Sequence, residues 1–219
     1  MENSKKVEHK DAGIGFQTKK FRLRGVTEIL GSLPASNAIF TQFIASKAPK
    51  EELMEEEADF VSLEEKGTTV FARNPQTKEL MLLDYQVKGL LKEGINVLKA
   101  DNEIGAGRKK TDNYVFVFPR YIPIKRNGVS LLDEDEMYER PLRCQTMQGE
   151  RVSLASSEMI RDPWEITIEI MLLNNKGTKA SAPLTWNAIE QALNYGHFKG
   201  LGQFRNGGFG RFEWEEIKD

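Results

Sequence analysis

The chain has 219 residues, 39% of them hydrophobic and 29% charged, a balance typical of folded proteins with one large domain or two small ones. No apolar run approaches the ~20 residues that cross a bilayer, and the N-terminus lacks the apolar core of a secretory signal. One cysteine and two histidines exclude an internal disulfide and argue against a zinc site. We therefore expect a cytoplasmic protein with no membrane partner, metal or cofactor.

The formal charge of −2 does not by itself indicate a protein that binds nucleic acid. The charges are segregated along the chain, however, and segregation of this kind can leave a basic surface on an acidic protein. Acidic residues gather in 51–60, 64–65 and 133–139, and basic residues in 19–24, 107–110 and 125–126. Each cluster is equally compatible with a solvated face that has no partner.

The N-terminal third is predicted to contain one strand and one helix. Residues 1–18 are polar and predict a flexible arm. In the following "KKFRLR", apolar and basic side chains alternate, as in a half-buried strand. Residues 36–48 predict a helix with Ser36 as N-cap, and the acidic stretch 50–66 predicts a loop or insertion.

The rest of the chain alternates between strands and helices. "NPQTK" predicts a turn between the strands of a hairpin, residues 85–98 predict an amphipathic helix, and 101–113 predict a loop. "YVFVFP" and "RYIPIK" resemble strands, and "MQGE" predicts a second hairpin turn. "WEITIEIMLL" is the clearest strand. Residues 184–195 predict a helix capped by Thr185 and ended by Gly196, before a last strand in "FGRFEW".

This order favours an α+β fold of the ferredoxin-like or RRM-like kind. In that arrangement, βαββαβ, two principal helices cover one face of an antiparallel sheet. Here the helices would be 85–98 and 184–195, the segments 20–24 and 209–214 would be neighbouring strands, and the remaining segments would be insertions. Because no linker or repeat divides the chain, we expect a single domain over residues 1–219.

A glycine-rich loop, predicted over residues 197–210, is the least ordinary segment. It holds five glycines within eleven residues, and each glycine costs about 0.5–1 kcal/mol of conformational entropy. Either the chain adopts positive φ angles repeatedly, or another molecule approaches its backbone closely. The loop lacks the Lys-Ser/Thr pair of a Walker motif and precedes a strand rather than a helix, which excludes both common nucleotide-binding loops. Its cations favour contact with phosphate.

Further basic residues extend the candidate site. Arg22, Arg24 and Arg211 are expected to share the open face of the sheet, where a basic surface would form a track for a single strand. The full set of candidate nucleic-acid-binding residues is Arg22, Arg24, Lys88, Lys92, Arg108, Lys109, Lys110, Lys199, Gly200, Gly202, Arg205, Asn206, Gly207, Gly208, Gly210 and Arg211.

Three segments resemble the repeat-associated mysterious protein (RAMP) superfamily, which forms the guide-RNA-binding backbones and guide-processing nucleases of CRISPR systems. The first is "GLGQFRNGGFGRFEW", similar to the C-terminal glycine-rich loop of those proteins. The second is Lys88-Gly89, similar to a Lys-Gly near the start of their first helix, and the third is "FRLRGVTEILGSLPA", similar to their opening strand. The resemblance implies a ferredoxin-like fold, RNA as ligand, and CRISPR-type proteins or further copies of the chain, in a filament, as partners. "RPLRCQTMQGERVSLASSE" also resembles proteins of bacteriophages.

The sequence offers no convincing catalytic group. His9 lies in the predicted arm, and Cys144 has no evident histidine partner. His197 could act as an acid in RNA cleavage, but a histidine after a helix end more often interacts with the helix dipole. Asp133 and Asp135 could bind magnesium, although a solvated loop explains them equally well. No catalytic residue is therefore assigned.

Two classes of function remain open. The first is a non-catalytic RAMP-like protein that binds RNA or another single strand. The second is a phage-type interaction protein that assembles with itself or blocks a CRISPR-like host complex, or that captures a nucleotide signal. The sequence does not discriminate RNA from DNA.

Overall fold

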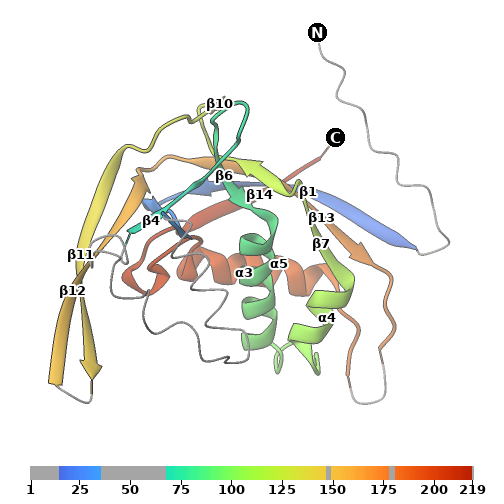
Figure 1. Cartoon of the computed structure of the whole chain (residues 1–219). Helices are drawn as coiled ribbons and strands as arrows, with labels where there is room; N and C mark the ends of the chain where they lie inside the picture. Colours follow the sequence, from blue (N-terminus) through green and yellow to red (C-terminus); the bar gives the residue numbers. More distant parts are fainter. Residues whose placement is uncertain (1–14, 36–67, 147–148, 178–180, 219) are drawn as a thin grey trace, which may run out of the picture.

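A computed structural model describes residues 15–35, 68–146, 149–177 and 181–218. In its main antiparallel sheet, four strands that come from distant parts of the chain lie in the spatial order β7, β13, β1, β14 (Figure 1). These strands are β1 (Phe16–Gly25), β7 (Val115–Phe118), β13 (Glu165–Leu173) and β14 (Phe212–Ile217). The first and last strands pair directly, with Lys20 opposite Ile217 and Gly25 opposite Phe212, as predicted from the sequence.

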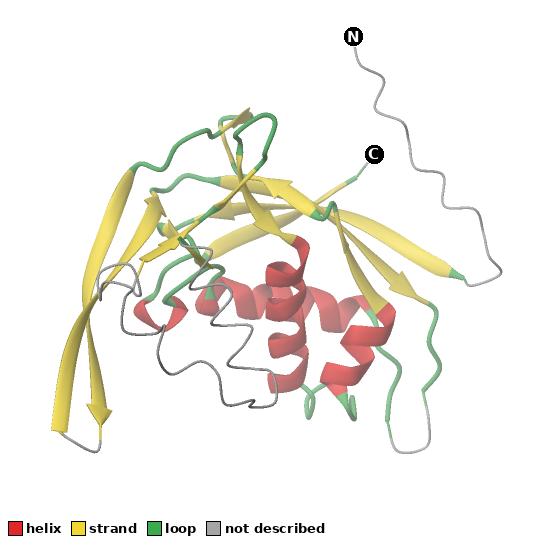
Figure 2. Cartoon of the chain, in the orientation of Figure 1, coloured by secondary structure: helices red, strands yellow, loops and turns green. Residues whose placement is uncertain are grey.

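Three helices lie on the same face of this sheet (Figure 2). They are α3 (Asp84–Val97), α4 (Gly107–Tyr114) and α5 (Trp186–Lys199). Without α4 and the shorter strands, the chain order is β1, α3, β7, β13, α5, β14. This is the βαββαβ order of a ferredoxin-like α+β fold, so the predicted fold class is confirmed.

The core lies between the sheet and the helices, and the sequence alternation explains it. Phe21 and Leu23 of β1 are fully buried, and so are Ile166 and Ile170 of β13. Their sequence neighbours point to the opposite face because side chains alternate along a strand. The helices supply the other half of the core, including Val87, Leu90, Leu91, Ile95, Ile189 and Leu193.

The insertions form two smaller sheets and one hairpin. The second sheet joins β2 (Ile29–Leu30), β3 (Leu33–Pro34) and β4 (Thr68–Val70) to the long strands β11 (Glu136–Thr146) and β12 (Gly149–Ile160). The third sheet contains β5 (Ala72–Arg73), β6 (Leu80–Leu83) and β8 (Tyr121–Pro123). The hairpin of β9 (Lys125–Arg126) and β10 (Val129–Ser130) extends the main sheet, because Lys125 of β9 pairs with Glu165 of β13. Strands β11 and β12 project away from the body of the protein (Figure 1).

Most predicted elements are found. Thr185 caps α5 by accepting a hydrogen bond from the backbone N–H of Ala188, and the hairpins around "NPQTK" and "MQGE" are present as β5–β6 and β11–β12. Within the part of the chain that is described, no helix is long and apolar enough to span a membrane. The single-domain organisation stays a prediction.

Three expectations need correction. The arm cannot extend to residue 18, because β1 begins at Phe16 and pairs there with Leu173. The predicted loop over 101–113 contains α4, where the buried Thr111 donates its hydroxyl to the carbonyl of Gly107. Helix α5 continues past Gly196 to Lys199, so the glycine-rich loop begins at Gly200. The predicted helix 36–48, the acidic insertion 50–66 and His9 lie outside the described residues.

Candidate nucleic-acid interface

The glycine-rich loop folds back on itself between α5 and β14. The backbone N–H of Leu201 donates to the carbonyl of Gly210 at 2.9 Å, which closes the loop. A short 3₁₀ turn, Arg205–Gly207, forms its tip. The N–H groups of Gln203 and Gly210 donate to the carbonyls of Leu30 and Glu28, at 3.1 and 2.6 Å. The loop is therefore a built part of the fold, held against the segment that follows β1.

The conformation of the loop itself accounts for its glycines. Gly210 has φ +72°, and a Cβ there would lie 1.9 Å from the carbonyl oxygen of Leu201. Gly208 has φ +91°, but a Cβ there would meet only the side chain of Arg211, at 3.6 Å or more. Positive φ or close approach of the same chain applies likewise to Gly200, Gly202 and Gly207. Of the two explanations that the sequence left open, positive φ angles and close packing within the chain account for these glycines. The glycines themselves therefore do not indicate contact with phosphate.

Two cations, Lys199 at the end of α5 and Arg205 of the loop, converge on one carboxylate of α3. A guanidinium nitrogen of Arg205 lies 2.8 Å from Glu93, and Nζ of Lys199 lies 3.6 Å from it. Lys199 also donates to the side-chain oxygen of Asn206 at 2.8 Å, and the hydroxyl of Tyr195 donates to Glu93 at 2.9 Å. Partial burial acts to raise the pKa of Glu93, but the hydrogen bonds from Arg205 and Tyr195, together with the positive charges of Arg205 and Lys199, lower it. The two cations are therefore held in place and partly neutralised.

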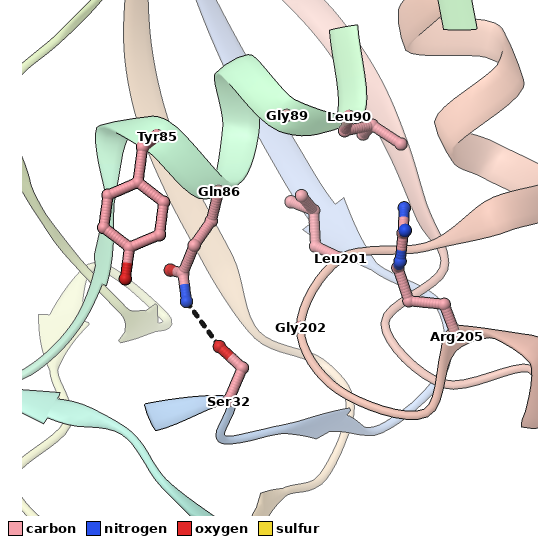
Figure 3. A pocket seen from close by; sticks show the side chains of 8 residues that line it. All are labelled: Ser32, Tyr85, Gln86, Gly89, Leu90, Leu201, Gly202 and Arg205. Carbon is pink, nitrogen blue, oxygen red and sulfur yellow. Dashed lines mark hydrogen bonds between the residues drawn. The ribbon is translucent and has the colours of Figure 1, made fainter. Parts of the chain in front are cut away.

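A pocket of about 230 Å³ lies between this loop and α3 (Figure 3). Its base is apolar, because Leu90 and Leu201 are each 1% exposed. Its rim is polar: the side-chain amide of Gln86 donates to the hydroxyl of Ser32 at 2.5 Å. The residues that line it are Ser32, Tyr85, Gln86, Gly89, Leu90, Leu201, Gly202 and Arg205. The pocket thus brings the glycine-rich loop and the Lys88-Gly89 segment together.

Two glycines of α3 differ in what surrounds them. A Cβ on Gly94 would lie 2.9 Å from the Cβ of Ala192, so this glycine allows α3 and α5 to pack closely. A Cβ on Gly89 would have nothing within 4 Å. Glycine within a helix costs about 1 kcal/mol relative to alanine, and no contact in the described structure requires that cost at Gly89. Its missing side chain keeps the pocket open.

The open face of the sheet is of mixed charge, contrary to the expectation of a basic track. Arg22 and Arg24 both contact Glu215, at 2.9 and 3.4 Å. Glu213 stands opposite Arg24 in the neighbouring strand. Arg211 lies beyond this cluster, where its backbone N–H donates to the hydroxyl of Thr27 at 2.9 Å. The carboxylates of β14 therefore neutralise the arginines of β1.

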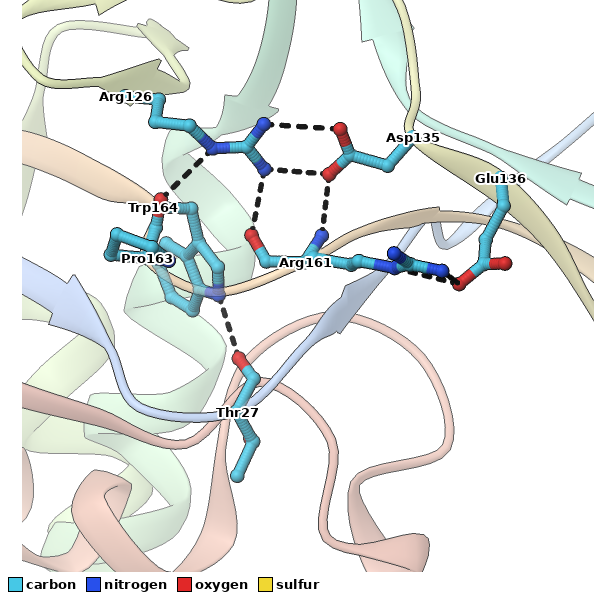
Figure 4. A network of polar contacts seen from close by, with 7 residues as sticks. All are labelled: Thr27, Arg126, Asp135, Glu136, Arg161, Pro163 and Trp164. Carbon is cyan, nitrogen blue, oxygen red and sulfur yellow. Dashed lines mark hydrogen bonds and ion pairs between the residues drawn. The ribbon is translucent and has the colours of Figure 1, made fainter.

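A hollow of about 370 Å³ adjoins Arg22 and Arg24, and Arg126 forms another part of its wall. Arg126 makes two hydrogen bonds to the carboxylate of Asp135, at 3.0 and 2.6 Å, and it also donates to two backbone carbonyls (Figure 4). The guanidinium of Arg126 therefore connects the β9–β10 hairpin to the residue that precedes β11.

The remaining predicted cations surround α4. Lys88 donates to the backbone carbonyl of Asp112 at 3.1 Å, and Lys92 forms an ion pair with the carboxylate of the same residue. Lys110 contacts Ser181 and Ala182, while Arg108 and Lys109 are exposed. The structure therefore separates the predicted residues into three groups: the loop, the open sheet face and the surface of α3 and α4.

Sequence reasoning missed several residues near the pocket. Ser32, Tyr85 and Gln86 line it. Tyr85 and Gln86 lie three and two residues before Lys88, so their place in the first turn of the same helix was a usable signal. Ser32 lies in the segment after β1 that the third resemblance covers, but nothing in that segment indicates a contact with the helix.

The arrangement supports no catalytic role for the groups considered. Nδ1 of His197 lies 3.1 Å from the carbonyl oxygen of Phe212, which ties α5 to β14. Asp135 is engaged with Arg126. Within the described ranges, no group of three or more His, Cys, Asp or Glu side chains could hold a metal ion. The side chain of Cys144 lies outside the described part.

No protein-family model matches the sequence, and no curated protein does. Among solved structures, the chain is similar to one in the "Cryo-EM structure of the Type III-B Cmr-beta bound to cognate target RNA", with a TM-score of 0.48 and 10% sequence identity. The match covers 93% of this chain and 61% of the other, so this chain spans less than two thirds of that protein's length.

Proposed function

We propose that this protein is a non-catalytic, RAMP-like protein that binds RNA or another single-stranded nucleic acid at the pocket between the glycine-rich loop and α3. One observation carries the proposal. The two segments that resemble RAMP proteins most, the loop and Lys88-Gly89, are separated by about half of the chain, yet both lie at the same pocket. The ferredoxin-like fold that the resemblance implies is also found, with its strands and helices in the expected order, and this supports the same proposal.

The chemistry of the pocket fits a single strand. Its apolar base can accept the face of a base or sugar, and Gly89 leaves the room that such a group needs. Arg205 stands at one side of the pocket, and Glu93, which holds it in position, also pairs with Lys199. A phosphate that enters can share these cations with Glu93, so binding is expected to weaken as salt increases.

An interaction with other protein chains is the second candidate. The β11–β12 hairpin projects from the body and exposes Met137 by 44% and Leu154 by 62%. Apolar side chains on a projecting hairpin favour contact with another protein, for which CRISPR-type proteins or a second copy of this chain are candidates. Light scattering of the purified protein across a concentration series tests self-assembly, and a constant monomer mass excludes it.

The main test is direct binding of labelled single-stranded RNA and DNA, measured by fluorescence anisotropy at several salt concentrations. Gly89→Leu fills the pocket and is expected to weaken binding at least tenfold. Val97→Leu, at an exposed position of the same helix, is the matched control and keeps wild-type affinity. Absence of binding by the wild-type protein, or equal affinity of Gly89→Leu, refutes the proposal. The RNA is expected to stay intact, because no acid–base pair is assigned.

A further inference from the structure

Three aromatic rings are exposed near the N-terminal half of α3. Tyr85 is 52% exposed, Tyr121 55% and Phe116 37%. Strand alternation turns Phe116 outward, because its neighbours Val115 and Val117 are buried. Exposed aromatic side chains that are grouped, rather than scattered, often mark a binding surface.

Cations stand beside these rings. The guanidinium of Arg120 lies 5.9 Å from the ring centroid of Tyr121, and Nζ of Lys88 lies 4.9 Å from that of Phe116. Both distances fit cation–π contact. Lys88 follows Tyr85 by three positions in α3, so the two side chains share one face of the helix.

Backbone contacts join the parts of this surface. The N–H of Asp84 donates to the carbonyl of Arg120 at 3.0 Å, and Leu83 pairs with Tyr121 between β6 and β8. Burial and the negative charge of Asp84 raise the pKa of the Tyr85 hydroxyl, and the positive charge of Arg120 partly opposes this increase. Aromatic and cationic groups therefore alternate along one strip, which we call the aromatic strip: Tyr121, Arg120, Tyr85, Lys88 and Phe116.

We propose that the aromatic strip is a stacking platform for the bases of a single strand that continues out of the pocket. The proposal rests on the proposed function and extends it, since Tyr85 belongs to both the pocket and the strip. Aromatic faces stack bases of any sequence, and neighbouring cations meet the phosphates between them. The strip therefore predicts binding with little sequence preference and a footprint longer than the pocket alone can hold.

The charge of the strip suits this ligand. Arg120 and Lys88 point their charges to the rings, while the nearby carboxylates have other partners: Asp84 accepts from the N–H of Tyr85, and Asp112 pairs with Lys92. A hydrogen bond from a backbone N–H leaves the charge of Asp84 in place, so a strand on the strip meets two cations and one carboxylate.

The test compares oligonucleotides with and without bases. Wild-type protein, Tyr121→Ala, Phe116→Ala and Tyr121→Phe are titrated by anisotropy against a 20-nucleotide strand and against the same strand with an abasic 3′ half. Each alanine variant is expected to lose about tenfold in affinity for the normal strand and little for the half-abasic one. Tyr121→Phe keeps the ring and the affinity. Phe198→Ala removes an aromatic ring that is 71% exposed on α5 and is the matched control.

The outcomes separate the two proposals. If Gly89→Leu weakens binding while Tyr121→Ala and Phe116→Ala bind as the wild type does, the proposed stacking on the aromatic strip is wrong. The proposed binding at the pocket is then retained. An equal loss on both strands also overturns the strip, because stacking needs bases. If the wild-type protein binds neither strand, both proposals fail. Thermal melts of every variant identify any loss of affinity that comes from unfolding. If Tyr121→Ala is unfolded, a loss of affinity in the folded Tyr121→Phe, which keeps the ring, contradicts stacking at that position.

Discussion

The guanidinium of Arg140 lies 4.7 Å from the ring centroid of Phe204, so the β11–β12 hairpin rests on the glycine-rich loop through a cation–π contact. Phe209 extends this contact, with its ring centroid 5.8 Å from Phe204 and 4.9 Å from Tyr138 of the hairpin. Arg140 is only 6% exposed, and it donates to the hydroxyl of Ser157 at 3.0 Å. Its Nε has no partner in the described part of the chain. The part of the hairpin around Tyr138 and Arg140 therefore packs on the loop.

Substitutions at this contact separate packing from charge. Phe204→Ala removes the ring over the buried guanidinium and is expected to lower the free energy of unfolding by about 1–2 kcal/mol. Arg140→Met keeps the volume but removes a buried charge, so its effect is expected to stay within about 1 kcal/mol. Urea unfolding of both variants measures the difference. A larger loss in Arg140→Met than in Phe204→Ala contradicts this account.

Two glycines of the loop are predicted to differ in their tolerance of alanine. At Gly210, positive φ and a clash with the carbonyl of Leu201 act together, so Gly210→Ala is expected to lower stability by more than about 2 kcal/mol. At Gly208 only the positive φ opposes a side chain, and the expected cost is about 1 kcal/mol. Thermal melts of the two variants provide the comparison, and equal melting temperatures would show that the clash is relieved at no cost.

Glycine substitutions in α3 are predicted to have opposite signs. Gly89→Ala adds a methyl group in open space and improves helix propensity, so it is expected to raise stability by about 0.5–1 kcal/mol. Gly94→Ala forces α3 away from Ala192 and is expected to destabilise the fold by about 1–3 kcal/mol. Calorimetric melts measure both. A destabilising effect of Gly89→Ala would contradict this account of open space at residue 89.

The pair between Asp135 and Arg126 predicts a dependence of stability on pH. Hydrogen bonds from Arg126, together with the backbone N–H of Arg161, lower the pKa of Asp135 in the folded state. A carboxyl whose pKa is depressed by folding stabilises the fold above its unfolded pKa, and the effect is lost as the pH falls through the folded value. Asp135→Asn is therefore expected to reduce stability at pH 7 and to match the wild type near pH 2.

The pH prediction is measured by urea unfolding of both proteins between about pH 2 and pH 8, because unperturbed aspartates titrate near pH 4. Asp133→Asn, at a nearby exposed aspartate, is the control for the loss of one carboxylate. A difference between wild type and Asp135→Asn that stays constant down to pH 2 contradicts the assignment.

Glu93 is predicted to limit the affinity of the pocket for phosphate. Glu93→Gln frees Arg205 and Lys199 from their carboxylate partner, so binding of a single strand is expected to tighten at low salt. The plot of log affinity against log salt is expected to steepen by up to about 0.7 for each cation that gains a phosphate. Glu216→Gln, which loosens Lys19 instead, is the control. An unchanged slope in Glu93→Gln would show that neither cation reaches the strand.

The fold could be predicted because its signals are local. The alternation in β13 and the capped, amphipathic α5 each follow from a few neighbouring residues, and their order selects the ferredoxin-like arrangement. Helix α4 was missed because it opens with a glycine after a left-handed Ala106 and carries no apolar stripe. Only its contacts with the rest of the protein identify it.

The candidate site was harder to predict, because its charges are paired across long separations. Glu93 reaches Lys199 and Arg205 from another helix, and no local pattern indicates that pairing. The mixed charge of the open sheet face was easier to predict from the sequence. If Phe212 faces the helices, then the alternation along β14 places Glu215 on the same side as Arg22.

The pairing of β1 with β14 has a consequence for synthesis of the chain. Strand β1 is made before every other described strand, yet one of its two edges is completed only by residues 212–217. Until those residues leave the ribosome, the backbone N–H and C=O groups of Lys20–Gly25 form an open edge that any other strand can join. A chain that ends early, before Phe212, keeps that edge and is at risk of aggregation. Residues 212–217 thus decide whether the first of the described strands to be made is protected.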